Sequence, residues 1–270
     1  VQEPKTEMSM LALKNGWAEQ DPEDWWRHVC AGILRIKSEN NLADTDISGI
    51  GISYQMHGLV LVDDDGIVLR NSIIWCDSRA VEIGEQAFEA IGEDKCTKHL
   101  LNSPANFTAS KLKWVKENEP EIYERIYKFM LPGDYIAYRL SGTINTTVSG
   151  LSEGIFWDFK EDVIAEVLMH HYGFDDSKVP DIVPTFSEQS TVNEQGASES
   201  GLQTGTPILY RAGDQPNNAL SLNVFNPGEV AATGGTSGVI YAVTDSLSVK
   251  EYALSLIHIS EPTRRTPTSY

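Results

Sequence analysis

Four short segments that are polar or rich in glycine each come directly after an apolar run typical of a buried strand. In α/β folds, ligands bind in the crevice beyond the carboxyl ends of the strands. We therefore expect these segments to form one site if their strands share or face one crevice. The segments are QMHG (residues 55–58), WCDSR (75–79), AGDQ (212–215) and GGTSG (234–238).

Hydrophobic periodicity predicts strands mixed with helices, which indicates an α/β layered fold. Asp21-Pro22 is typical of a helix start, because Asp is a good N-cap and proline suits the first helical position. The polar residues 175–205 are expected to form a surface connection. The expected strands are 47–54, 59–62, 67–69, 73–75, 129–131, 207–210, 230–233 and 239–243, and the expected helices are 79–91, 110–118, 121–127, 162–172 and one that follows Asp214.

The excess of acidic residues limits the kinds of molecule that this protein is expected to bind. The chain has 270 residues, with 21 Lys+Arg against 39 Asp+Glu and a formal net charge of −18. Holding a nucleic-acid backbone or an anionic membrane surface requires clustered positive charge, so neither partner is expected. No apolar run reaches the ~18 residues of a membrane-spanning helix, and the first ten residues lack a signal-peptide pattern. Three cysteines without metal-ligand spacing fit a reducing, cytoplasmic setting.

Asp214 and the glycine-rich segment are the strongest candidates for chemistry, and each has two interpretations. Asp214 stands between a predicted strand and a predicted helix, where it could cap the helix or act as a general base that accepts a hydroxyl proton. Residues 234–238 could hold phosphate oxygens through backbone N–H groups and hydroxyls, or could form a plain hairpin turn. His57 has donors and acceptors suited to a sugar hydroxyl, although a lone histidine is more often structural.

Several motif-like patterns are better explained as structure. DDDG at 63–66 predicts a hairpin turn and not a calcium loop, because the register set by Gly66 puts Leu61 and Ser72 where an EF-hand needs acids. The S-x-x-K pattern at 110–113 has no accompanying K-T-G element. His170 and His171 are adjacent and point to different helix faces, so no metal ligand is predicted. Neither a Walker A loop nor a Rossmann fingerprint occurs.

Six segments together resemble the xylulokinase branch of the FGGY carbohydrate kinases, over about residues 15–252. QMHG after a strand rich in Gly and Ile, followed by a Trp-x-Asp segment, is specific within that family. The resemblance implies actin-like (ribonuclease H-like) ATPase domains around a deep cleft, and transfer of the γ-phosphate of Mg-ATP to the C5 hydroxyl of D-xylulose. A homodimer of the intact enzyme is compatible with it. The segments are 15–26, 51–80, 106–126, 131–142, 212–220 and 234–243.

The resemblance also implies a role for individual residues. Asp214 corresponds to the catalytic base of the family. The sugar-binding positions would be Met56, His57, Asp77 and Gln215, and the positions of the second ATP phosphate turn would be Gly235, Thr236 and Ser237. Gln215-Pro216 departs from the commoner Asp-Asn. Cys76 either lines the sugar site or packs in the core, and packing is favoured because free cysteines are usually buried.

The same resemblance divides the chain into three parts. We expect residues 1–225 to form the N-terminal actin-like domain without its first strand and Asp-x-Gly-Thr phosphate turn, 226–253 to begin the C-terminal domain, and 254–270 to be a non-native tail. The hypothesis is a middle part of a kinase gene, with the isolated chain weakly active or inactive. Alternatives are a non-catalytic sugar-binding or regulatory relative, a kinase for glycerol or L-ribulose, and a non-functional fragment.

Overall fold

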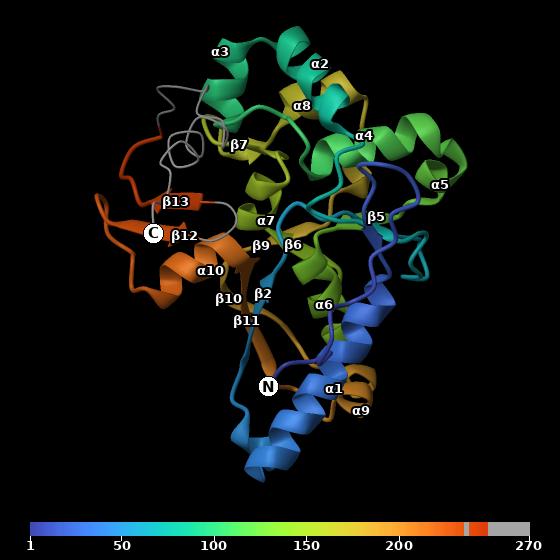
Figure 1. The fold of residues 1–270 in the computed structure, drawn as a ribbon, viewed down its shortest axis with the longest axis vertical. Helices are drawn as coiled ribbons and strands as arrows, with labels where there is room; N and C mark the ends of the chain where they lie inside the picture. Colours follow the sequence, from blue (N-terminus) through green and yellow to red (C-terminus); the bar gives the residue numbers. More distant parts are fainter. Residues whose placement is uncertain (235–237, 248–270) are drawn as a thin grey trace, which may run out of the picture.

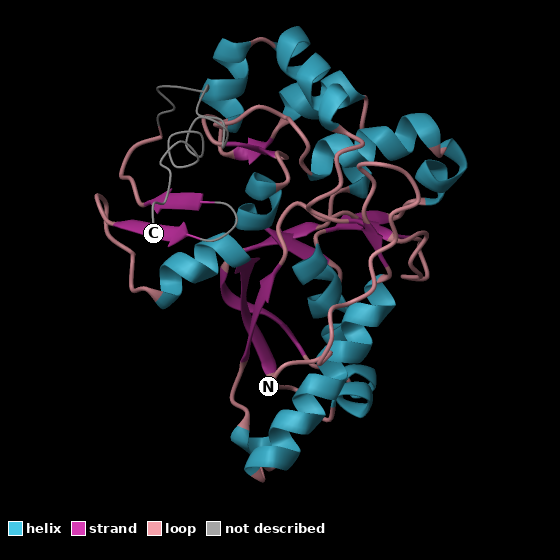
Figure 2. Ribbon diagram, viewed as in Figure 1, coloured by secondary structure: helices cyan, strands magenta, loops and turns pink. Residues whose placement is uncertain are grey.

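The computed structural model describes residues 1–234 and 238–247, and Figures 1 and 2 show strands gathered in the middle with helices around them. Its α-helices are α1 (Pro22–Asn40), α2 (Val81–Ile91), α3 (Glu93–Lys95), α4 (Thr108–Asn118), α5 (Pro120–Arg125), α6 (Pro132–Ser141), α7 (Val148–Glu153), α8 (Glu166–Tyr172), α9 (Glu194–Ser200) and α10 (Asp214–Ser221). Its strands are β1 (Glu19–Gln20), β2 (Ile50–Tyr54), β3 (Val60–Val62), β4 (Ser72–Ile73), β5 (Lys128–Met130), β6 (Asn145–Thr147), β7 (Trp157–Asp158), β8 (Val163–Ile164), β9 (Asp181–Val183), β10 (Phe186–Thr191), β11 (Pro207–Gly213), β12 (Val230–Gly234) and β13 (Gly238–Ala242). Short helical turns at Asp44–Asp46, Cys96–Leu100 and Asp176–Lys178 connect them.

The antiparallel strands β3 and β5 separate two hydrophobic cores. Successive side chains of a strand point to opposite faces, so Leu59 and Leu61 enter one core while Val60 and Val62 enter the other. All four side chains are at most 1% exposed. This burial on both faces explains why residues 59–62 form an unbroken apolar run.

The strands β10, β11 and β2 form the sheet that positions the candidate site (Figure 1). β11 pairs with β2 in parallel and with β10 antiparallel. The register places Gly213 opposite Tyr54, the last residues of β11 and β2. Because the two parallel strands end side by side, the segments that follow them, residues 55–58 and residues 214 onward, leave the sheet at the same edge.

Helices α1, α6 and α9 pack together, and Figure 1 shows α6 to the right of this sheet with the labels of α1 and α9 lower down. α1 begins as predicted, with Pro22 in its first turn and the Asp21 carboxylate accepting from the backbone N–H of Glu23 at 2.9 Å. The indole N–H of Trp26 donates to Glu199 of α9, and Arg139 of α6 donates to the same carboxylate at 3.0 Å. These contacts hold the three helices as one layer.

The second core lies among α2, α4 and α8, at the top of Figure 1. The predicted hairpin turn at 63–66 is present, with Gly66 at φ +76° and its N–H donating to the carbonyl of Asp63 at 2.9 Å. Leu69 bonds back to Leu61, although the main partner of β3 is β5. In the described part of the chain, no helix is long and apolar enough to cross a membrane.

Four sequence expectations are corrected. The strand expected at 67–69 does not form, and Val68 makes only an isolated bridge to Val62. Residues 175–205 contain β9, β10 and α9 and are not a plain surface connection. The helix expected at 162–172 begins only at Glu166, since Val163 and Ile164 pair with β7. Pro132 begins the helix α6, which the sequence analysis did not predict.

Candidate functional site

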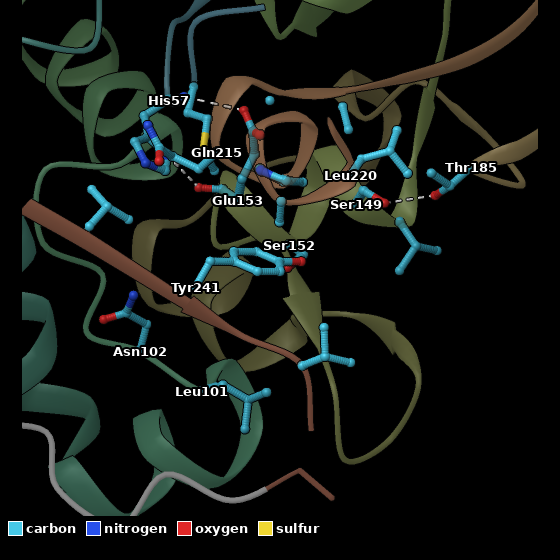
Figure 3. Close-up of a pocket in the computed structure, with 18 of the residues that line it drawn as sticks. His57, Leu101, Asn102, Ser149, Ser152, Glu153, Thr185, Gln215, Leu220 and Tyr241 are labelled. Carbon is cyan, nitrogen blue, oxygen red and sulfur yellow. Dashed lines mark hydrogen bonds between the residues drawn. The ribbon is translucent and has the colours of Figure 1, made fainter. Parts of the chain in front are cut away.

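A cavity of about 1070 Å³ opens where β2 and β11 end (Figure 3). Its walls come from segments far apart in the sequence: the turn after β2, the end of α7, the start of α10 and the hairpin β12–β13. The residues that the sequence predicted for a sugar site and that line it are Met56, His57 and Gln215. Other lining residues include Asn102, Phe107, Ser149, Ser152, Glu153, Thr185, Ala212, Gly213, Pro216, Leu220 and Tyr241.

Gly213 allows the two sequence segments to approach each other. A β-carbon at this position would lie 2.3 Å from Cγ of Met56 and 2.8 Å from Oε2 of Glu153. Neither approach is sterically feasible for a real side chain, so the absence of one at residue 213 lets Met56 lie against β11. The glycine of the AGDQ segment is therefore explained by packing.

Asp214 is the first residue of α10 and is exposed. Gly213 stands at the N-cap position, so the Asp214 carboxylate does not cap this helix by a side-chain bond. A carboxylate in the first helical turn is stabilised by the helix dipole. Oδ2 of Asp214 accepts from Nε2 of Gln215 at 3.1 Å. Asp214 is not among the residues that line the cavity, although its neighbours Gly213 and Gln215 both are.

His57 is held by hydrogen bonds on its backbone and on its ring. Its backbone has φ +62°, in the left-handed region that non-glycine residues rarely occupy. The N–H of His57 donates to Oε1 of Glu153 at 3.2 Å, and Nδ1 lies 2.9 Å from the carbonyl oxygen of Glu153. The ring meets Phe107 edge to face, with centroids 4.5 Å apart. Burial lowers the pKa of His57 from 6.5 to about 4.

Glu153 is a site residue that the sequence analysis missed. It ends α7, is 9% exposed and lines the cavity beside His57 (Figure 3). Burial raises the pKa of its carboxyl well above the usual range, and the charges of Asp134 and Asp214 act in the same direction. No motif surrounds Glu153 in the sequence. Only its buried position in the fold brings it to the site.

Asp77, also predicted to bind sugar, is not among the residues lining the cavity. It is fully buried, and its carboxylate accepts from the backbone N–H of Ala18 at 2.6 Å and from Nη2 of Arg79 at 2.7 Å. These bonds give Asp77 a role in joining the segment around Ala18 to the segment that precedes α2.

Cys76, the neighbour of Asp77, is exposed, so the expected packing of this thiol in the core is wrong.

Two further sequence predictions concern a phosphate turn and metal ligands. Gly235, Thr236 and Ser237 lie outside the described residues, and the strands that flank them pair antiparallel, with Val230 opposite Ala242. Among residues 1–234 and 238–247, no group of three or more His, Cys, Asp or Glu side chains is placed to hold a metal ion. His170 and His171 belong to no such group.

The chain belongs to the FGGY family of carbohydrate kinases, because residues 1–221 match the N-terminal domain of that family. It is 31% identical over 236 residues to the xylulose kinase of Bacillus subtilis (strain 168), which covers 86% of this chain and 46% of that protein. The crystal structure of xylulose kinase from Rhodospirillum rubrum is similar with a TM-score of 0.83 at 26% identity, over 89% of this chain and 49% of that one.

A glycerol kinase of Plasmodium falciparum, solved with ADP, is similar with a TM-score of 0.75 at 23% identity, over 87% of this chain and 48% of that one. At this identity the likeness concerns the fold alone. The fold expected from the sequence, an actin-like α/β ATPase domain, is confirmed by these neighbours. The chain spans about half the length of the relatives it matches.

Proposed function

We propose that this chain is part of a pentulose kinase that transfers the γ-phosphate of ATP to the C5 hydroxyl of D-xylulose and so forms D-xylulose 5-phosphate. The observation that carries the proposal is the meeting of Met56, His57 and Gln215 in one cavity, with Asp214 hydrogen-bonded to Gln215. The similarity to xylulose kinases supports the choice of sugar.

Asp214 is the proposed general base. Phosphoryl transfer requires little covalent chemistry from the protein, which mainly positions the acceptor and stabilises charge. The exposed carboxylate of Asp214, not used as a helix cap, is free to orient the attacking hydroxyl and accept its proton. Met56, His57 and Gln215 would hold the sugar so that this hydroxyl reaches Asp214.

ATP and Mg²⁺ are proposed as the second substrate and its ion. Gly235, Thr236 and Ser237 are the proposed contacts to the phosphates, through backbone N–H groups and hydroxyls. Mg²⁺ commonly uses one or two carboxylates together with substrate phosphates and does not require a cage of protein ligands. The ion would neutralise charge on the phosphates when it is bound.

Two alternatives stay open. A kinase for another polyol is compatible with the fold shared with the Plasmodium falciparum glycerol kinase. A non-catalytic sugar-binding relative would use the same cavity without turnover. Both predict occupancy of the cavity by a polyhydroxylated ligand, and they differ from the main proposal in the sugar used or in the absence of ADP release.

Coupled ADP release with D-xylulose, glycerol and L-ribulose tests the proposal. It is measured on this chain and on a chimera in which the chain is completed with the half of the Bacillus subtilis relative outside the matched region. We expect turnover of D-xylulose by the chimera and a fall of about 10²–10⁴-fold in Asp214→Ala, the range for a general base. Asp64→Asn, an exposed carboxylate in the hairpin turn, is the matched control. Turnover of glycerol or L-ribulose alone contradicts the choice of sugar, and sugar binding without ADP release favours the binding relative.

A further inference from the structure

The residues around His57 leave one ring nitrogen for a ligand. A carbonyl oxygen cannot donate, so the 2.9 Å contact between Nδ1 and the Glu153 carbonyl requires the proton to be on Nδ1. In a neutral imidazole the other nitrogen, Nε2, then carries no proton and can only accept. Within the described part of the chain, Nε2 of His57 makes no hydrogen bond to the protein.

A buried lysine also holds the backbone of His57. Nζ of Lys111 donates to the carbonyl oxygen of His57 at 2.8 Å and to that of Ile74 at 3.0 Å. The Lys111 side chain is fully buried, and its ammonium opposes a second positive charge on the His57 ring. The backbone carbonyl, the backbone N–H and Nδ1 of His57 are therefore all engaged by Lys111 and Glu153.

We propose that Glu153 is a positioning residue that, together with Lys111, fixes His57 in the tautomer whose unprotonated Nε2 accepts a hydrogen bond from a ligand hydroxyl in the cavity. The consequence is selectivity for ligands that present a hydroxyl donor at this point, as sugars and polyols do. The identity of the ligand rests on the proposed function, whereas the tautomer does not. Glu153 does not have to touch the ligand for this role.

The tautomer is tested by ¹⁵N NMR of the 270-residue chain labelled at histidine, with the His57 signal assigned by its loss in His57→Asn. Between about pH 6 and pH 8 we expect a protonated Nδ1 and a bare Nε2, since burial and the Lys111 ammonium both oppose protonation of the ring. Glu153→Gln keeps an acceptor for the His57 N–H and should keep the tautomer. Glu153→Ala keeps the carbonyl that faces Nδ1 but removes the acceptor that holds the His57 backbone, so the turn can shift, the bond from Nδ1 weakens and the two tautomers should mix. Glu89→Ala, exposed on α2, is the control.

Ligand binding is measured on the same proteins by calorimetric titration with D-xylulose. We expect an affinity within about twofold of the parent for Glu153→Gln, and about tenfold weaker binding for Glu153→Ala and His57→Asn, the scale of one lost hydrogen bond. A proton on Nε2, or a Glu153→Ala protein with unchanged tautomer and affinity, would overturn the proposal. The expected tautomer without D-xylulose binding would count against the proposed sugar and leave the positioning by Glu153 standing.

Discussion

Nε of Arg211 donates to Oδ1 of Asp134 at 2.7 Å, and neither side chain is more than 2% exposed. Arg211 lies in β11 close to Asp214, and Asp134 lies in the first turn of α6. The hydroxyl of Thr146 donates to the other oxygen of Asp134 at 2.9 Å, and Arg211 also donates to the carbonyl of Asn145 at 2.8 Å. This buried pair joins the strand that carries the candidate base to α6 and β6.

Removing one partner of this pair should be severely destabilising. Arg211→Met leaves the Asp134 carboxylate buried without its cation, and we expect a loss of about 3–5 kcal/mol in the free energy of unfolding measured with urea. The pair of the exposed Arg125 with the half-buried Asp63, at 3.5 Å, offers the comparison, since Arg125→Met should cost less than about 1 kcal/mol. Recovery of part of the loss in the double variant Arg211→Met/Asp134→Leu would support the cause given, and equal losses for the two arginines would refute it.

Gly213→Ala should disturb the cavity. The new β-carbon would have to displace Met56 or shift the strand end, so we expect a loss of about 1–3 kcal/mol in the free energy of unfolding and weaker D-xylulose binding. Gly32→Ala is the matched control, because a β-carbon there meets nothing closer than the Glu3 β-carbon at 3.9 Å, and Gly to Ala inside a helix is stabilising. Unchanged binding in Gly213→Ala would show that the approach of Met56 to β11 does not shape the site.

His57 should make the protein less stable in acid. The pKa of His57 is about 4 in the folded protein, whereas its ordinary value is 6.5. Below pH 6.5 the unfolded chain therefore binds a proton at His57 that the folded chain does not bind. Stability due to this group is thus lost as the pH falls from 6.5 toward 4, by up to about 3 kcal/mol. The stability of His57→Asn, whose side chain tolerates a positive φ, should depend less on pH over this range. Parallel pH profiles of the two proteins in urea unfolding would contradict the burial of a neutral ring.

The ionisation of Glu153 should make the stability depend on pH in the opposite direction to that of His57. Its pKa is raised in the folded state, so the folded chain holds a proton that the unfolded chain releases as the pH rises past about 4.5. The parent therefore loses stability relative to Glu153→Gln over the pH range above about 4.5 in which the folded carboxyl stays protonated, since the neutral amide has no proton to lose. A stability difference that stays constant or reverses over this range, measured by urea unfolding, would show that Glu153 is ionised in the fold.

Local signals in the sequence predicted most of the helices and strands around the candidate site. The Asp21-Pro22 start of α1 and the apolar strands β2 and β11 are local features, and parallel pairing then places Met56 beside Gly213. The strand β10 was not predicted, because its sequence FSEQST does not alternate between apolar and polar residues. Only Gln189 of this strand is buried. α9 is short and contains glycine and serine, and it is supported by the Asn193 side chain at its N-terminus.

Part of the candidate site was predictable because the ends of strands can be located from local sequence features. Residues that directly follow strands, such as His57 and Gln215, could be expected at the sheet edge. Asp77 also follows a strand, but Arg79 two residues later engages its carboxylate, and Asp77 does not line the cavity. Glu153 reaches His57 only through tertiary packing, which neither periodicity nor motif spacing encodes.

The parallel pairing of Ile52 with Arg211 has a consequence for how this chain is made. Within the described residues, β11 is the strand that pairs with β2, so a nascent chain leaving the ribosome exposes the free edge of β2 until residue 213 has emerged. Pairing between strands that are far apart in the sequence slows folding. It also lengthens the time during which the chain can aggregate through the unpaired strand edge. Binding of a chaperone to the nascent β2 edge would therefore act on the same segment that later leads into the candidate sugar site.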